Sequence, residues 1–231
     1  MVYAQPTADP PWSILSWLDG ARFDHFLVDA DHSQIEAVAS SAGRVLAAIH
    51  SFSFPTAGFF GPDLSIEYPI DASNGWTSLF EEWLFRGRAG PRLGDDLRSR
   101  LWRVITANEW RLDEVRDDPR LLHADYKPWN LLVRDGEVAA VLDWEFAFAG
   151  PPLNDVGIFL RHSRALPASY ARGFERGYRE AGGRLPEGWR RLSRLLDLLS
   201  LCQFLERPED DPAVLRDVRP LIEMTVDEFA P

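Results

Sequence analysis

The residues of this chain whose types suit catalysis lie close together along the sequence. Asp125 is followed by Asn130 after five positions and by Asp143 after eighteen. A carboxylate such as Asp125 can accept the proton of an attacking hydroxyl. Asn130 and Asp143 offer the hard oxygen ligands that suit Mg²⁺. The set predicts magnesium-assisted phosphoryl transfer to a hydroxyl.

A predicted β-hairpin explains how Asn130 and Asp143 can share a site. Residues 131–134 and 137–142 read as two apolar strands, and the Asp-Gly pair between them is a strong signal for a two-residue hairpin turn. Antiparallel pairing brings the outer ends of a hairpin together. We therefore expect the amide of Asn130 to lie beside the carboxylate of Asp143.

The loop before this hairpin carries the remaining chemistry. Asp125 lies there, and Lys127 is close enough along the chain to reach a transferring phosphate. The pattern H-x-D-x-x-x-x-N that begins at His123 is a weak signal alone, but its setting between apolar strands is that of a kinase catalytic loop. Glu145 is left out of the metal set, because a structural carboxylate is the simpler interpretation.

Three segments resemble motifs of the aminoglycoside phosphotransferase and choline-kinase-like family. Residues 123–125 are similar to its H-G-D, with Ala124 at the usual glycine. Residues 142–145 are similar to its h-D-W-E, and residues 150–157 to its G-x-P-x-x-D-h-[GA]. The resemblance implies an α+β, kinase-like fold whose mostly helical C-terminal lobe contains the catalytic hairpin.

The same resemblance implies roles for individual residues. Asp125 would be the catalytic base, assisted by Lys127, and Asn130 and Asp143 would bind Mg²⁺. His123 and Asp155 would support the catalytic loop structurally. ATP and magnesium are the implied cofactors, and the partner is a small-molecule hydroxyl acceptor.

Residues 13–20 look like the last strand of a small lobe followed by a hinge. By resemblance, the carbonyl of Ser16 and the N–H of Leu18 would bind adenine, above an apolar floor of Leu132 and Leu142. An ordinary buried strand and turn is the alternative.

The chain is expected to hold only part of the kinase-like small lobe. Residues 1–20, with strands at 2–4 and 13–16, would be a remnant of that lobe and its hinge. Residues 21–231 would form the large lobe, with the catalytic loop at 121–145. Lys127 is the only lysine, so no strand lysine can pair with the phosphates, and no glycine-rich loop precedes the hinge.

Two functions follow from these observations. The first is a phosphotransferase that moves the γ-phosphate of ATP to a small-molecule hydroxyl. The second is a non-catalytic, kinase-like module that binds a nucleotide, a metabolite or a protein partner. The apolar segment at residues 2–18 also predicts a homodimer, because exposed strand edges tend to be covered.

Composition limits the number of domains, the partners and the localisation that we expect. The chain has 231 residues, 45% of them hydrophobic, and a net charge of −11, which indicates one globular domain and argues against nucleic acid as a partner. The acidic residues of 200–231 fit either a cationic acceptor or a solvated surface. Cys202 reads as a buried, inert thiol. No signal peptide or membrane-spanning run is found, so we expect a cytoplasmic protein.

Periodicity predicts helices over most of the remaining chain. Residues 51–75 read as a loop whose aromatic residues either line an acceptor pocket or pack onto the core, and His50 reads as a helix cap. The expected helices are 33–50, 76–87, 95–116, 154–163, 168–181, 187–206 and 212–228.

Overall fold

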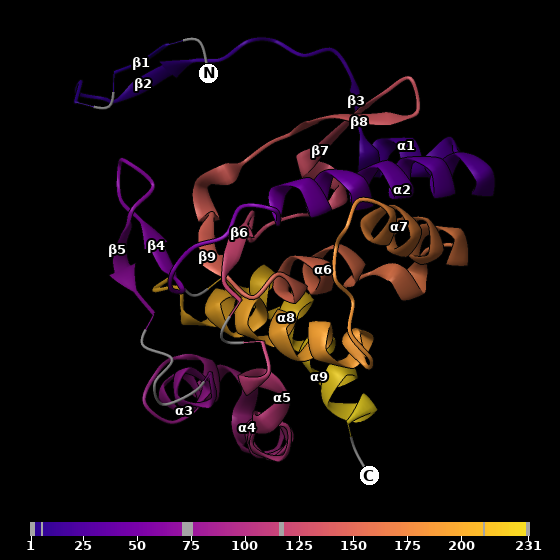
Figure 1. The fold of residues 1–231 in the computed structure, drawn as a ribbon. Helices are drawn as coiled ribbons and strands as arrows, with labels where there is room; N and C mark the ends of the chain where they lie inside the picture. The colour runs from indigo at the N-terminus through magenta and orange to yellow at the C-terminus, as the bar shows by residue number, and fades with distance from the viewer. Residues whose placement is uncertain (1–2, 6, 71–75, 116–117, 210, 230–231) are drawn as a thin grey trace.

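The structure of the chain is a computed structural model that describes residues 3–5, 7–70, 76–115, 118–209 and 211–229. It is an α+β fold in which helices predominate (Figure 1). The helices are α1 Phe23–Asp29, α2 His32–Ile49, α3 Thr77–Phe85, α4 Ala89–Ala107, α5 Glu109–Asp113, α6 Leu153–Leu160, α7 Ala168–Glu180, α8 Trp189–Glu206 and α9 Pro212–Glu228.

The strands are short and pair in antiparallel fashion throughout. They form a two-stranded sheet (β1-β2), a three-stranded sheet (β3-β7-β8) and a four-stranded sheet (β5-β4-β9-β6). Their bounds are β1 Tyr3–Gln5, β2 Trp12–Ile14, β3 Ala21–Arg22, β4 Gly58–Phe60, β5 Ile66–Pro69, β6 Arg120–Leu122, β7 Leu131–Arg134, β8 Glu137–Val141 and β9 Phe148–Gly150.

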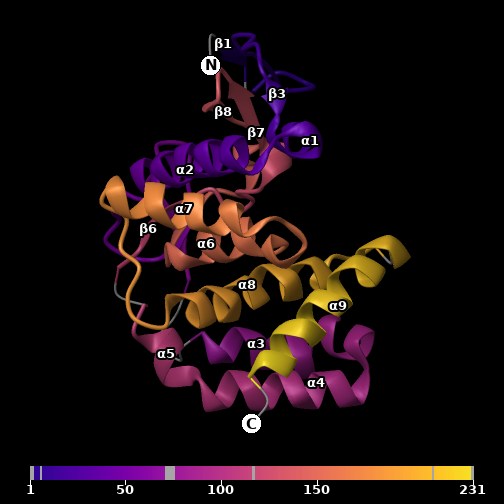
Figure 2. The ribbon, with the colours of Figure 1, turned by 90° about the vertical axis from the view of Figure 1, so that its right-hand side faces the viewer.

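The helices stack in layers beneath the β7–β8 hairpin (Figure 2). The pair α2 and α7 packs closely because small residues line their contact. A Cβ built on Gly177 would lie only 1.9 Å from the backbone oxygen of Ser40, and one built on Gly43 would lie 2.3 Å from that of Phe174. This close packing fixes the end of α2, where His50 stands next to the catalytic loop.

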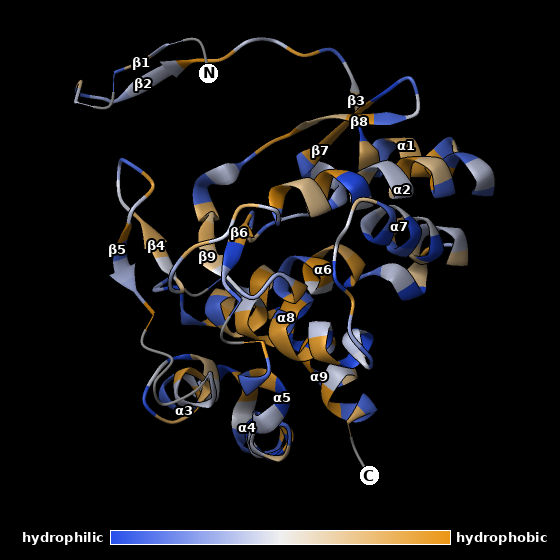
Figure 3. Ribbon diagram, in the orientation of Figure 1, coloured by the Kyte–Doolittle hydropathy of each residue, from blue (hydrophilic) through white to orange (hydrophobic). Residues whose placement is uncertain are grey.

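The core lies between these helical layers. Hydrophobic residues concentrate on α6 and α8 (Figure 3). Leu195, Leu196, Leu198 and Leu201 of α8 are buried, on the helix that the periodicity predicted at 187–206. Cys202 is also buried, and its burial raises the pKa of the thiol. Its interpretation as a buried core residue is therefore confirmed.

Residues 3–20 differ from the rest in burial. Strands β1 and β2 form the two-stranded sheet at one end of the molecule (Figure 1), and large side chains such as Trp12 and Ile14 remain exposed. Trp17 is 88% exposed. The second strand is shorter than the predicted 13–16, and Val2 of the first lies outside the described residues.

Several expectations need correction. Residues 51–75 are not simply a loop, because they contribute β4 and β5 to the four-stranded sheet; residues 71–75 lie outside the described part of the chain. The helix expected at 95–116 is two helices, α4 and α5, which meet at Asn108, and Arg116 is not described. The short helix α1 was not predicted.

The other helices lie within a few residues of their expected ends, as at α2, α6 and α8. None of the helices in the described residues combines the length and hydropathy that crossing a lipid bilayer requires.

Candidate active site

The predicted hairpin forms and brings its two outer ends together. Leu131 pairs with Val141, and one step further out the N–H of Leu142 donates to the carbonyl of Asn130 at 2.8 Å. The turn residues Asp135 and Gly136 have φ of 54° and 78°, the left-handed values that an Asp-Gly turn accommodates. Asn130 therefore lies across the hairpin from the segment that continues into Asp143.

Asp155 anchors the backbone of the catalytic loop. This fully buried carboxylate accepts the backbone N–H of Ala124 at Oδ1 and that of His123 at Oδ2, both at 2.8 Å. Oδ2 also lies 3.2 Å from Nε2 of His50, whose Nδ1 lies 2.7 Å from the hydroxyl of Tyr178. His50 is the C-cap of α2, as the sequence predicted. Its side chain has a second contact that the sequence did not reveal, because it meets the carboxylate that holds the loop.

His123 links the loop to the far strand of the hairpin. Its Nδ1 accepts the N–H of Asp125 at 3.2 Å, so the ring proton belongs on Nε2, which donates to the carbonyl of Leu142 at 2.7 Å. The two bonds fix the ring as the neutral tautomer. They tie the loop before β7 to the residue that precedes Asp143.

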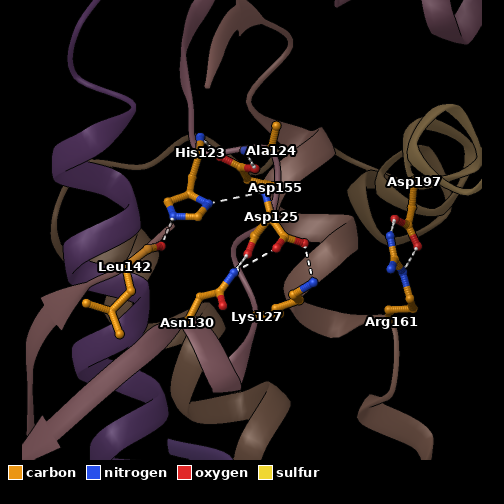
Figure 4. Close-up of polar contacts among 9 residues, drawn as sticks. All are labelled: His123, Ala124, Asp125, Lys127, Asn130, Leu142, Asp155, Arg161 and Asp197. Atoms are coloured by element: carbon orange, nitrogen blue, oxygen red, sulfur yellow. Dashed lines mark hydrogen bonds and ion pairs between the residues drawn. The ribbon is translucent and has the colours of Figure 1, made fainter. Parts of the chain in front are cut away.

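Asp125 stands at the centre of these contacts (Figure 4). It is 8% exposed, and its Oδ2 accepts from Nδ2 of Asn130 at 2.7 Å. Its Oδ1 pairs with Nζ of Lys127 at 2.5 Å, and that ammonium lies 4.8 Å from the ring centre of Trp129. The structure thus joins Asp125, Lys127 and Asn130 in one polar cluster.

Ala124 occupies a strained position between His123 and Asp125. Its φ is 62°, in the left-handed region where a Cβ is unfavourable. The family motif has glycine at this position, and the positive φ of Ala124 gives the physical reason for that preference. The backbone N–H groups of His123 and of Ala124 itself both donate to Asp155, which holds the backbone in this conformation.

The donor set at the end of the hairpin fits Mg²⁺. Nδ2 of Asn130 is engaged by Asp125, so its Oδ1 is turned away from that carboxylate (Figure 4). Asp143 is exposed and has a φ of 60°. Within the described ranges no three His, Cys, Asp or Glu side chains cluster as metal ligands. Mg²⁺ does not need such a cluster, because it commonly binds one or two protein oxygens and completes its shell with phosphates and water.

An ion pair near the loop was missed by sequence reasoning. Arg161 donates to both carboxylate oxygens of Asp197, at 2.9 and 2.5 Å, and both side chains are largely buried. Burial lowers the pKa of this guanidinium, but Asp197, with a further contribution from Asp125, raises it overall. A permanent positive charge therefore lies close to Asp125. Arg161 and Asp197 are 36 positions apart in the sequence, and neither belongs to the motifs described above.

The expected hinge residues lie just before β3, the strand that pairs with β7 of the hairpin. Ser16 and Leu18 are exposed and belong to no strand. Two residues on, Gly20 packs against β7, where a built Cβ would be 3.0 Å from the oxygen of Val133 and 3.3 Å from Cβ of Leu132. The segment thus reaches the apolar face of the hairpin on which Leu132 is half-buried and Leu142 is 37% exposed.

A cavity of about 350 Å³ opens beside Asp125. Ala124 and Asp125 form part of its wall, together with the segment from Glu145 to Phe148 and residues of α3 and α8. A volume of this size lies within the range of small-molecule sites. Among the aromatic residues of segment 51–70, Phe59 lines this cavity, whereas Phe54 packs on Phe60 and Tyr68 is exposed.

The chain belongs to the phosphotransferase enzyme family, whose APH family model matches residues 3–195. This match confirms the resemblance inferred from the three motifs. Sequence comparison with curated proteins finds no match.

Solved structures of this fold extend the comparison. The chain matches a thermostable mutant of aminoglycoside phosphotransferase APH(4)-Ia in ternary complex with AMP-PNP and hygromycin B at 22% identity and a TM-score of 0.60, covering 88% of this chain and 68% of that one. Macrolide 2'-phosphotransferase MphH from Brachybacterium faecium matches at 20% and 0.57, covering 84% and 62%. Choline kinase LicA from Streptococcus pneumoniae matches at 14% and 0.58, covering 86% and 66%. At these identities the likeness shows the shared fold.

Proposed function

We propose that this protein transfers the γ-phosphoryl group of ATP to a hydroxyl of a small molecule. The observation that carries the proposal is the position of Asp125. It is held by Asn130 and Lys127 on one side, and it borders a cavity of about 350 Å³ on the other. A carboxylate fixed at the wall of a cavity is suited to accept a proton from a bound alcohol.

The proposed reaction assigns a task to each residue. As the acceptor oxygen bonds to phosphorus, its proton passes to Asp125, and the bond between the γ-phosphorus and the bridging oxygen breaks to release ADP. Lys127, now paired with Asp125, would stabilise charge on the transferring group. When bound, Mg²⁺ would neutralise the phosphates, and Asn130 and Asp143 are the residues that would hold it.

The nucleotide would lie on the hairpin side of the catalytic loop. We propose the backbone of Ser16 and Leu18 as the adenine contacts and Leu132 and Leu142 as the apolar floor. Gly20 supports this proposal, because it places the preceding segment against β7. In this arrangement residues 1–20 form the small-lobe and hinge portion, and residues 21–231 form the large lobe. His123 and Asp155 would act by holding the loop, without contacting substrate.

A turnover assay tests the function directly. Protein is incubated with Mg·ATP and a panel of alcohols, and phosphorylated product is identified by mass spectrometry. We expect Asp125→Asn to reduce turnover by about 10²–10⁴-fold, the usual contribution of a general base. Asp135→Asn is the matched control, because Asp135 lies at the exposed hairpin turn with its side chain 95% accessible.

The contrary outcome supports the non-catalytic module. If the chain binds ATP but no alcohol is phosphorylated, or if Asp125→Asn leaves turnover unchanged, the proposed reaction is wrong. The homodimer predicted from residues 2–18 is a separate proposal, since Trp17 and Ile14 are exposed there. A sedimentation experiment at micromolar concentration that shows only monomer would contradict it.

A further inference from the structure

The cavity beside Asp125 is walled mainly by apolar side chains. They come from β4, α3, β9 and α8 and from the segments next to them. Aromatic rings make up much of this wall, and a surface of this kind favours an apolar ligand because it removes apolar area from water on both sides. The aromatic lining residues are Phe59, Trp76, Trp83, Phe146, Phe148 and Phe204.

Few charges face this cavity. Among the described residues, the ionisable groups that line it are Asp125, Glu145 and Arg207. Asp125 is already paired with Lys127, and the guanidinium of Arg207 lies over the ring of Phe204 at 4.8 Å. A ligand with several positive charges would therefore lose hydration here without gaining enough carboxylate partners, which is unfavourable.

The acidic residues near the C-terminus do not supply the missing partners. Asp227 pairs with Arg100, and Glu228 pairs with Arg164 and Arg194. These carboxylates are absent from the described lining of the cavity. Their acidity therefore fits a solvated, ion-paired surface, which is one of the two interpretations that the sequence left open.

Two buried polar groups offer pairing within the otherwise apolar wall. Trp76 and Asn154 both line the cavity, and each is only 3% exposed. Nε1 of Trp76 and Oδ1 of Asn154 have no hydrogen-bond partner among the residues described. The amide nitrogen of Asn154 already donates to the carbonyl of Leu196 at 2.9 Å, which fixes the orientation of the side chain. Isolated polar groups in an apolar wall are typical of small-molecule sites.

We infer that the acceptor is an uncharged alcohol with a compact, ring-containing apolar body, and that it is not a polycation. The inference rests on the proposed function, because the hydroxyl must meet Asp125 while the apolar body fills the cavity. The aromatic side chains of α3 and α8 would then select the acceptor, and the catalytic loop would act on its hydroxyl.

Binding measured by calorimetry tests this inference without relying on turnover. Borneol and menthol serve as uncharged ring alcohols, and choline and hygromycin B serve as cationic probes. We expect the ring alcohols to bind at least tenfold more tightly than either cationic probe. Tighter binding of choline or hygromycin B would overturn the inference.

Matched variants locate the binding site. We expect Trp83→Ala and Phe204→Ala, which remove rings from the cavity wall on two different helices, each to weaken borneol binding at least fivefold. Phe85→Ala is the control, because Phe85 lies on the same helix as Trp83 but is half exposed and outside the lining. Unchanged affinity in both cavity variants, or an equal loss in Phe85→Ala, would contradict the assignment.

The same samples separate this inference from the proposed function. If ring alcohols bind in the cavity but Mg·ATP yields no product, the ligand class is supported and the reaction fails. If only the cationic probes are phosphorylated, the reaction is supported and the ligand class is wrong.

Discussion

The catalytic loop and the cavity wall meet at Asp125, and they are built on different principles. The loop is held by directional hydrogen bonds. Asp155 accepts two backbone N–H groups, His123 bonds to a backbone carbonyl, and Asn130 bonds to the carboxylate of Asp125. The cavity wall is formed by aromatic and aliphatic contacts. Removing one partner of a buried hydrogen bond destabilises the fold strongly, because the other partner stays unsatisfied. Exchanging apolar side chains of similar volume in a wall usually changes stability little. If the proposed function holds, this difference would keep the chemistry constant on one side of Asp125 and let recognition vary on the other.

The largest expected effect on stability comes from a substitution that disrupts the catalytic loop. Asp155→Asn replaces a carboxylate oxygen with an amide donor, so at least one of the backbone N–H groups of His123 and Ala124 loses its buried acceptor. We expect the free energy of unfolding to fall by about 2–4 kcal/mol. Urea unfolding measures the change, with Asp135→Asn as the exposed control. A loss below about 0.5 kcal/mol would show that Asp155 does not hold the loop.

A smaller effect of opposite sign sharpens the same comparison. Ala124→Gly removes the Cβ that makes a φ of 62° unfavourable. The entropy of glycine in the unfolded chain offsets part of this gain. We expect a net stabilisation of about 0.5–1 kcal/mol in urea unfolding, with turnover retained. Destabilisation of the variant would mean that the positive φ carries no strain.

The smallest effect is expected on the cavity side. Gln203 is exposed and lines the cavity from α8. We expect Gln203→Ala to change unfolding free energy by less than about 0.5 kcal/mol, as is usual for surface substitutions. Its effect should be on the relative rates with different alcohols. A destabilisation comparable to that of Asp155→Asn would remove the distinction between the two sides.

Local signals in the sequence predicted the hairpin well. The Asp-Gly turn and its flanking apolar residues specify β7 and β8 without distant partners. The spacing of Asp125 and Asn130 suggested one loop, and the structure brings these two side chains into contact. The proximity of the Asn130 and Asp143 side chains stays a prediction. Amphipathic periodicity gave most helices because their buried faces repeat regularly.

Distant pairings explain what sequence reasoning missed. β4 pairs with β9 about ninety positions away, so nothing in residues 51–75 themselves reveals a strand. His50 meets Asp155 across 105 positions. The helix α1 begins after Arg22 without a side-chain cap, so it carries no start signal. For β4 and for His50, the deciding contact forms only after the chain has folded.

The most direct test of the proposed site is a crystal structure with AMP-PNP and Mn²⁺, in which anomalous scattering locates the ion. We expect one manganese peak about 2 Å from a carboxylate oxygen of Asp143 and Oδ1 of Asn130, with phosphate oxygens completing its shell. Asp125 should then face the cavity beside the γ-phosphate. A nucleotide-bound ion that contacts neither Asn130 nor Asp143 would contradict the proposed phosphotransfer site.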